Sequence, residues 1–247
     1  MAGVLADLLA ADARIAADAA VAAVNGDRFV ATWDALRYLA ARIEALEARA
    51  DPVGSPAPLD LPVPELTEWA SSVGSWCVPV GKRSTIVVGE LCDGSVLDAL
   101  VETGRQVRGV DPRGPSIWRA FGTARVGRST PDLVIDEVAA HLASLPGGSA
   151  AAVVLAGCVD RLDLPGKIGL LDEAVRVVEP GGSVVVLTSD QAAFDRSLPP
   201  TALDLLPGRP FHPETWLLLF DRADASETKW HRPERGSVHA VVARFDR

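Results

Sequence analysis

The chain has 247 residues, 48% of them hydrophobic, so it is long enough for one α/β domain with an appendage and apolar enough for a sizeable core. Basic residues number 24 against 33 acidic ones, a formal charge of −9 without a basic block, which disfavours nucleic acid as a partner. Three scattered cysteines, Cys77, Cys92 and Cys158, are too few for a disulfide framework or a zinc cluster, so we expect a reducing cytoplasm.

Residues 1–50 are expected to form a helical hairpin, with Asn25-Gly26 as the stop between its two helices. In the second helix Phe29, Leu36 and Ile43 recur every seven residues and form a narrow apolar seam. This seam packs either on the hairpin partner or the main domain, or else between the subunits of a homo-oligomer. Acidic residues interrupt the apolar start of the chain and no basic residue precedes it, so we predict neither a signal peptide nor a membrane span.

Residues 51–64, DPVGSPAPLDLPVP, contain five prolines and are expected to be a largely extended linker. Proline removes a backbone donor and restrains the residue before it, which disfavours a helix there. The main domain is expected to cover residues 65–247. It begins with a short amphipathic helix from Glu65 to Trp76, which leads into the first strand.

Strands and helical segments then alternate, which indicates a mainly parallel sheet with helices on both faces. Only RPERGS joins the last two strands, too short for a crossover helix, so that pair should be antiparallel. The expected strands are Thr85–Gly89, Gln106–Val110, Ala151–Ala156, Ser183–Thr188, Thr228–His231 and Val238–Phe245. The expected helices are Ser95–Thr103, Ile135–Ser144, Leu164–Val178 and Pro213–Ala223.

The turn after the first strand and the acidic end of the second carry the clearest signs of a ligand site. Asp111 lies about where a ribose-binding carboxylate sits in nucleotide-binding sheets, although it could instead cap the turn before Pro112. Gly89 and Gly94 have the spacing of a P-loop, but the lysine that would reach phosphate is missing, and the dinucleotide motif G-x-G-x-x-G is absent. A G-x-S-x-G nucleophile elbow is absent as well, which argues against a serine hydrolase.

Three passages resemble the class I S-adenosylmethionine-dependent methyltransferases, over about residues 70–247. They are VRGVDPRG at 107–114, VVLAGCVDRL at 153–162 and LLDEAVRVVEPGGSVVVL at 170–187. In the third, Pro180-Gly181-Gly182 looks like the turn that ends a helix and leads into strand five of that family. FHPETWLLLFDRAD, at 211–224, resembles the helix after that strand. The resemblance implies a seven-stranded Rossmann-like fold with a C-terminal antiparallel hairpin, and S-adenosylmethionine as cofactor.

The glycine-rich motif of that family is altered in this chain, which has Glu90 and Cys92 at the first two glycine positions and Gly94 at the third. Glycine serves there because the backbone must approach the methionine part of the cofactor without a Cβ in the way. Two hypotheses stay open. The chain is either a methyltransferase acting on a small-molecule or glycan hydroxyl, or a catalytically silent protein of the same fold that acts as a structural or regulatory partner.

The candidate catalytic residues are His212, a possible general base toward an acceptor hydroxyl, and Asp160, just beyond strand four. Each has a structural alternative, since His212 could cap the helix that begins at Pro213, and Asp160 could cap the next segment or pair with Arg161. No metal site is expected. The candidate cofactor-binding residues are Gly89, Glu90, Asp93, Gly94, Asp111 and Cys158.

Overall fold

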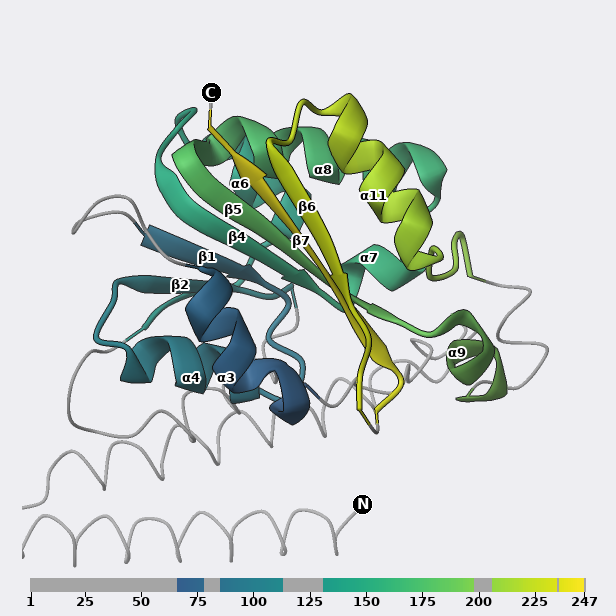
Figure 1. The fold of residues 1–247 in the computed structure, drawn as a ribbon. Coiled ribbons are helices and arrows are strands. Elements are labelled where there is room, and N and C mark those ends of the chain that lie inside the picture. The colour runs from purple at the N-terminus through teal and green to yellow at the C-terminus, as the bar shows by residue number, and fades with distance from the viewer. Residues whose placement is uncertain (1–65, 78–84, 113–130, 198–205, 235, 247) are drawn as a thin grey trace, which may run out of the picture. The chain divides into compact units, whose positions relative to one another are not determined.

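The computed structural model describes residues 66–77, 85–112, 131–197, 206–234 and 236–246 (Figure 1). The predicted helical hairpin at 1–50 and the predicted linker at 51–64 lie outside these residues. Both therefore stay predictions, as does the contact between subunits through the hairpin.

The described residues form one seven-stranded sheet in the order β3-β2-β1-β4-β5-β7-β6. Strands β3, β2, β1, β4 and β5 are parallel, whereas β7 runs antiparallel to both β5 and β6. The predicted α/β fold class with its antiparallel C-terminal pair is thereby confirmed. The strands are β1 (Thr85–Gly89), β2 (Val107–Val110), β3 (Asp132–Val134), β4 (Ala150–Ala156), β5 (Val178–Ser189), β6 (Glu227–His231) and β7 (Val238–Phe245).

Helices cover both faces of this sheet and bury a separate apolar core on each (Figure 1). Helices α3 and α4 pack on one face; α6, α8 and α11 pack on the other. The central strand β4 is buried along its whole length, as expected of a parallel strand covered on both sides. The helices are α3 (Thr67–Trp76), α4 (Ser95–Glu102), α6 (Val138–Ser144), α7 (Cys158–Arg161), α8 (Leu164–Val177), α9 (Gln191–Ser197) and α11 (Pro213–Arg222).

The structure departs from the predicted elements at β3, α7, α9 and the start of β5, and α6 begins at Val138 rather than at Ile135. Strand β3 was not predicted because it has only three residues, too few to show alternation. Helices α7 and α9 were missed because each is short and directly follows a strand. Strand β5 begins at Val178, so the Pro-Gly-Gly segment lies within the strand rather than before it.

That segment is a bulge, because Ala150 pairs with Val178 but Ala152 pairs with Ser183. Gly181 has φ 79°, a left-handed conformation that glycine adopts readily. A Cβ on Gly182 would lie 2.6 Å from the carbonyl oxygen of Ala151. Both glycines are thus required for the chain to enter the sheet so closely.

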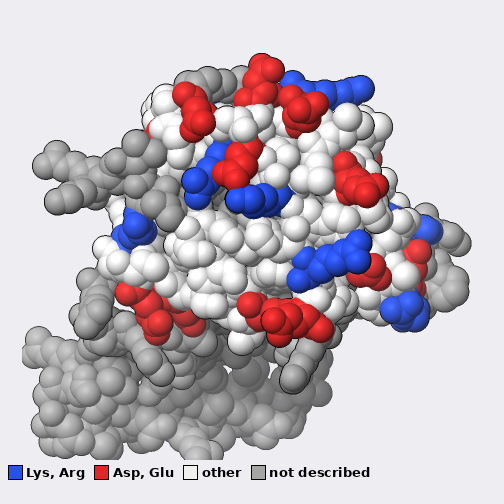
Figure 2. All heavy atoms as spheres, viewed as in Figure 1, with Lys and Arg blue, Asp and Glu red and all other residues white. Residues whose placement is uncertain are grey.

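The surface of the face drawn in Figure 1 mixes acidic and basic side chains. Figure 2 shows lysine and arginine lying among aspartate and glutamate, without one continuous basic area on this face. Among the described residues, no helix is both long and apolar enough to span a bilayer.

Candidate functional site

The candidate site lies at the edge of the sheet where the parallel strands end. Strands β1, β2, β4 and β5 are parallel neighbours, so their carboxyl ends meet at this edge, where open α/β sheets bind ligands. Ser189 at the end of β5 pairs with Val238 at the start of β7, which brings the β6–β7 connection to the same edge.

The turn between β1 and α4 has three residues in the left-handed conformation that favours glycine, and only one of the three is a glycine. The φ angles of Glu90, Cys92 and Gly94 are 58°, 51° and 84°, all in the left-handed region. These are the three positions that the resemblance in the sequence aligns with the glycines of the methyltransferase motif. A non-glycine residue pays about 1–2 kcal/mol for this conformation, so the turn keeps its shape at an energetic cost.

The side chains of Glu90 and Cys92 fill the space between this turn and the end of β4. Both residues are only 2% exposed. A Cβ on Gly157, which follows β4 with φ 70°, would lie 2.6 Å from Glu90 Oε2 and 3.1 Å from Cys92 Sγ. The Arg161 guanidinium in α7 donates a hydrogen bond to Glu90 Oε1. The turn and α7 are therefore joined by a partly buried ion pair across the carboxyl ends of β1 and β4.

Asp111 follows β2, as predicted, and its carboxylate is directed at the same turn. It is fully buried, and Oδ2 accepts a hydrogen bond from the Leu91 backbone N–H at 3.0 Å. The predicted ribose-binding group thus also holds the turn in place. A ligand reaches this carboxylate only when groups around it move.

Three other predicted cofactor-binding residues make structural contacts near this turn. Gly89 is needed for packing, because a Cβ there would lie 2.5 Å from Val138 Cγ1 of α6. Gly94 caps the start of α4. Asp93 accepts hydrogen bonds from the Ser95 backbone N–H and from the Leu66 backbone N–H, at 3.1 and 2.8 Å, and so ties the starts of α3 and α4 together.

Cys158 and Asp160 lie in α7, on the far side of the ion pair. Burial, reinforced by the Glu90 carboxylate, raises the pKa of the Cys158 thiol well above its usual value, so the thiol is neutral. Asp160 accepts hydrogen bonds from Thr188 Oγ1 at 2.6 Å and from the Ser189 backbone N–H at 2.8 Å. Burial raises the Asp160 pKa although these hydrogen bonds oppose the shift.

These contacts favour a positioning role for Asp160, because both carboxylate oxygens hold α7 against the end of β5. Its predicted catalytic role stays a prediction. Arg161, considered as a partner of Asp160, pairs with Glu90 instead.

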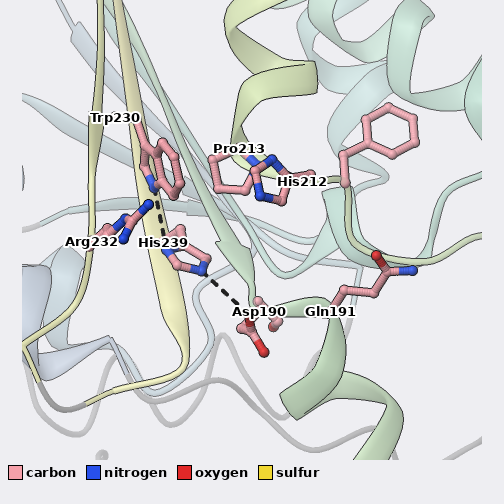
Figure 3. A pocket seen from close by; sticks show the side chains of 9 residues that line it. Asp190, Gln191, His212, Pro213, Trp230, Arg232 and His239 are labelled. Carbon is pink, nitrogen blue, oxygen red and sulfur yellow. Dashed lines mark hydrogen bonds and ion pairs between the residues drawn. The ribbon is translucent and has the colours of Figure 1, made fainter.

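A pocket of about 290 Å³ lies beyond the end of β5. The starts of α9 and α11 form one side of it and the β6–β7 hairpin forms the other (Figure 3). Its walls combine aromatic rings with charged and amide groups. The lining residues are Ser189, Asp190, Gln191, Phe211, His212, Pro213, Trp230, Arg232 and His239.

Polar contacts fix four of these side chains relative to one another (Figure 3). Trp230 Nε1 donates a hydrogen bond to His239 Nδ1 at 3.4 Å, and His239 Nε2 lies 3.6 Å from Asp190 Oδ2. Burial lowers the His239 pKa despite the Asp190 carboxylate, which keeps the imidazole neutral near pH 7. The Arg232 guanidinium lies 4.5 Å from the centre of the Trp230 ring system.

His212 combines the two roles that the sequence leaves open. Its Nδ1 accepts a hydrogen bond from the Glu214 backbone N–H at 3.3 Å, so it caps α11. Its ring also lines the pocket, 5.5 Å from the Trp230 ring and nearly perpendicular to it. Glu214 Oε2 lies 3.9 Å from the same nitrogen.

Sequence reasoning missed Asp190, Trp230 and His239 as pocket residues. Asp190 directly follows β5, so the strand-end rule that singled out Asp160 applied to it as well. Trp230 and His239 come together only through the β6–β7 register, in which His231 pairs with Ala240. No short motif in the sequence encodes that register.

No protein-family model and no curated protein matches the sequence. Among solved structures, a candidate O-methyltransferase from Nostoc punctiforme has a TM-score of 0.55 at 17% identity, covering 72% of this chain and 56% of that one. A SAM-dependent methyltransferase from Archaeoglobus fulgidus has a TM-score of 0.55 at 15% identity, covering 72% of this chain and 94% of that one. The N-methyltransferase NodS from Bradyrhizobium japonicum, solved with S-adenosyl-L-homocysteine, has a TM-score of 0.53 at 14% identity, covering 73% and 84%.

The chain therefore has the class I S-adenosylmethionine-dependent methyltransferase fold, as the resemblance in its sequence implies. It spans little more than half the length of the Nostoc protein.

Proposed function

We propose that this protein, which has the class I methyltransferase fold, transfers a methyl group from S-adenosylmethionine to a hydroxyl group of a small molecule or glycan. One observation carries the proposal: a nucleotide-type turn and a separate polar-aromatic pocket lie on the same carboxyl edge of the sheet. The turn follows β1 and the pocket follows β5, with only β4 between those strands. A two-substrate transfer needs two such adjoining sites.

The residues around the turn fit the cofactor in backbone shape and in charge. The left-handed conformations at Glu90, Cys92 and Gly94 preserve the shape of a glycine cradle. Asp111 supplies a carboxylate for ribose hydroxyls. Glu90 and Arg161 supply one negative and one positive group where the zwitterionic methionine end would lie. The fit requires these buried side chains to open, since they fill the space between the turn and β4.

The pocket beyond β5 suits a hydroxyl-bearing acceptor with an apolar face. Trp230 offers an amphipathic ring surface, while Asp190, Gln191 and Arg232 offer an acceptor, an amide and a donor for several hydroxyl groups. NodS and the Nostoc protein carry the names of N- and O-methyltransferases, so the fold alone does not choose the acceptor atom. The polar lining of the pocket favours a polyhydroxylated molecule.

His212 is the proposed base that removes the acceptor proton. Its Nδ1 lone pair is held only by a long bond of 3.3 Å to the Glu214 N–H, which an acceptor hydroxyl can replace. The Glu214 carboxylate, 3.9 Å from Nδ1, then stabilises the imidazolium. When bound, S-adenosylmethionine supplies a methyl group already activated by its sulfonium, so the chain needs no nucleophilic side chain.

The test is methyl transfer from labelled S-adenosylmethionine to a panel of sugars and phenols. We expect labelled product with at least one acceptor, and at least about tenfold less product when Trp230→Ala removes the ring surface of the pocket. Trp76→Ala, which changes an aromatic residue on α3 outside this pocket, is the matched control. Transfer that is equal in both variants would contradict the placement of the acceptor.

A catalytically silent protein of this fold is the second candidate, and the burial of Glu90, Cys92 and Asp111 favours it. In that case the filled turn excludes the cofactor permanently. Binding of the demethylated cofactor, without any acceptor, separates the two candidates.

A further inference from the structure

The ion pair between Glu90 and Arg161 occupies a particular place in the fold. It bridges the turn after β1 and the helix after β4, and the Glu90 carboxylate lies against Gly157, close enough to exclude even a Cβ there. Glu90 is 2% exposed, whereas the Arg161 side chain is 26% exposed. Arg161 is thus the partner that can leave toward solvent, while Glu90 stays inside.

We propose that cofactor binding exchanges this ion pair for two contacts with the methionine end of the cofactor, Glu90 with its ammonium group and Arg161 with its carboxylate. The inference rests on the proposed function. In the closed state each side chain satisfies the charge of the other, and in the bound state the zwitterion satisfies both.

Charge complementarity favours an exchange over simple blocking. A carboxylate as buried as that of Glu90 is costly to leave unpaired, so the pair opens only for a ligand that brings a positive group to Glu90. The methionine end brings that group, together with a negative group for Arg161. An adenosine derivative without the amino-acid tail brings neither and leaves the pair closed.

The exchange therefore makes Glu90 and Arg161 determinants of ligand specificity. Binding of a ligand with the amino-acid tail forms two charged contacts and breaks one, the ion pair. Binding of a tail-free nucleoside neither forms nor breaks a charged contact. This difference predicts that removal of the two charges weakens only the binding of ligands that carry the tail.

The experiment is calorimetry with two ligands, S-adenosylhomocysteine and 5′-methylthioadenosine, which share the nucleoside and thioether and differ in the tail. The proteins are the parent, the double variant Glu90→Gln with Arg161→Gln, and Arg222→Gln, which changes an exposed arginine of α11. The double variant removes both charges together, so no buried charge is left alone. Melting curves establish that it is folded.

The exchange predicts that the double variant binds S-adenosylhomocysteine about tenfold more weakly than the parent, the net loss of one charge-assisted contact. Its affinity for 5′-methylthioadenosine should stay within about twofold of the parent value, and Arg222→Gln should match the parent with both ligands. The two single variants, Glu90→Gln and Arg161→Gln, lose one ligand contact but also the competing pair, so by the same count their affinities should stay near that of the parent.

Equal or tighter binding of S-adenosylhomocysteine by the double variant overturns the exchange, because the pair would then be only an obstruction. The proposed function would survive that result. If the parent protein gives no heat of binding with S-adenosylhomocysteine above that of dilution into buffer, the proposed function itself is overturned. The exchange is then overturned with it.

Discussion

Cys92 has a backbone conformation that is strained for a residue with a side chain. With φ 51° it lies in the left-handed region, where any residue with a Cβ is strained and glycine is not. The side chain is buried against the end of β4, and this packing offsets the strain of the backbone. Strain in the turn is thus balanced by packing across the sheet edge.

This balance predicts an unusual order of stability for two substitutions. Both Cys92→Ala and Cys92→Gly lose the sulfur, but only glycine also relieves the left-handed strain. We expect Cys92→Gly to be more stable than Cys92→Ala by about 1 kcal/mol in urea unfolding, the reverse of the usual preference for alanine. The same pair of substitutions at Ser71, an exposed position in the middle of helix α3, should show the ordinary order. Alanine more stable than glycine at position 92 would show that the turn is not strained.

His212 permits a substitution that separates capping from catalysis. Asparagine is a good N-cap but has no titratable nitrogen, so His212→Asn should keep α11 capped and remove the proposed base. We expect methyl transfer to fall about 100-fold with the melting temperature nearly unchanged. His212→Ala should lose both, with a further cost of about 1 kcal/mol in unfolding. Full activity in the asparagine variant would assign His212 to capping alone.

Asp160 should leave a signature in the pH dependence of stability. Its folded-state pKa is raised by burial, so the folded protein holds this proton more tightly than the unfolded chain does. The resulting stabilisation is complete below the ordinary carboxyl pKa and is lost as pH rises through the raised pKa. Asp160→Asn does not titrate; its amide oxygen can accept from the Ser189 N–H, and its amide nitrogen can donate to the Thr188 hydroxyl.

The expected result is therefore a change in relative stability with pH. Relative to Asp160→Asn, the parent should lose unfolding free energy as the pH of urea titrations is raised from acid toward neutrality. A difference between the two proteins that does not vary with pH would mean that the Asp160 pKa is not raised.

At this scale the sequence indicated which positions of the turn have an unusual backbone, but not which side chains they contact. Aligning the turn on Gly94 put Glu90 and Cys92 at glycine positions, and both have left-handed φ angles. The partner of Glu90 is Arg161, which lies 71 positions away in the sequence and comes close only because β1 and β4 are neighbours. Local spacing carries no information on such a contact.

Helix α7 connects the two halves of the candidate site, although it has only four residues. Arg161 contacts the turn after β1, and the adjacent Asp160 contacts Thr188 and Ser189 at the end of β5. Asp190, the residue after Ser189, lines the pocket beyond β5. The turn is therefore connected to the pocket through the Glu90–Arg161 ion pair, the Asp160 hydrogen bonds and the peptide bond from Ser189 to Asp190.

Gly157, which precedes α7, sets the spacing of this connection. Gly157→Ala should lower the unfolding free energy by about 2 kcal/mol or more, since a Cβ there adds left-handed strain and a clash with Glu90 and Cys92. Gly148→Ala, with φ 65° and open space, should cost only the strain, about 1 kcal/mol. Gly169→Ala, in the exposed part of α8, should stabilise by about 0.5–1 kcal/mol. Equal effects at 157 and 148 would contradict the close packing of α7.

Elements with a recognisable apolar pattern were the ones that the sequence predicted well. Strand β1 and strand β7 have the predicted bounds, and β4 and α8 differ from prediction by one residue each. Their apolar runs are long enough to reveal the period of the structure. Strand β3 and helix α7 depend on neighbours in the sheet rather than on their own pattern, so periodicity did not find them.

The whole described domain is a sheet whose carboxyl edge carries the filled turn after β1 and an open pocket beyond β5. The fold was predictable because alternating strands and helices, with a closing hairpin, leave few sheet topologies. The state of the turn was not, because it depends on an ion pair between distant strands. The homo-oligomer through residues 1–50 and the cytoplasmic location stay predictions.

The most direct measurement is titration of the parent protein and Asp111→Asn with S-adenosylhomocysteine by calorimetry. Asparagine keeps an oxygen for the Leu91 N–H and loses the carboxylate that accepts from ribose hydroxyls. We predict saturable binding by the parent, at least about tenfold weaker binding by Asp111→Asn, and no change in Asp172→Asn, an exposed aspartate of α8. A parent protein that shows no saturable binding at millimolar ligand, or equal affinities in all three proteins, would contradict a cofactor site at this edge of the sheet.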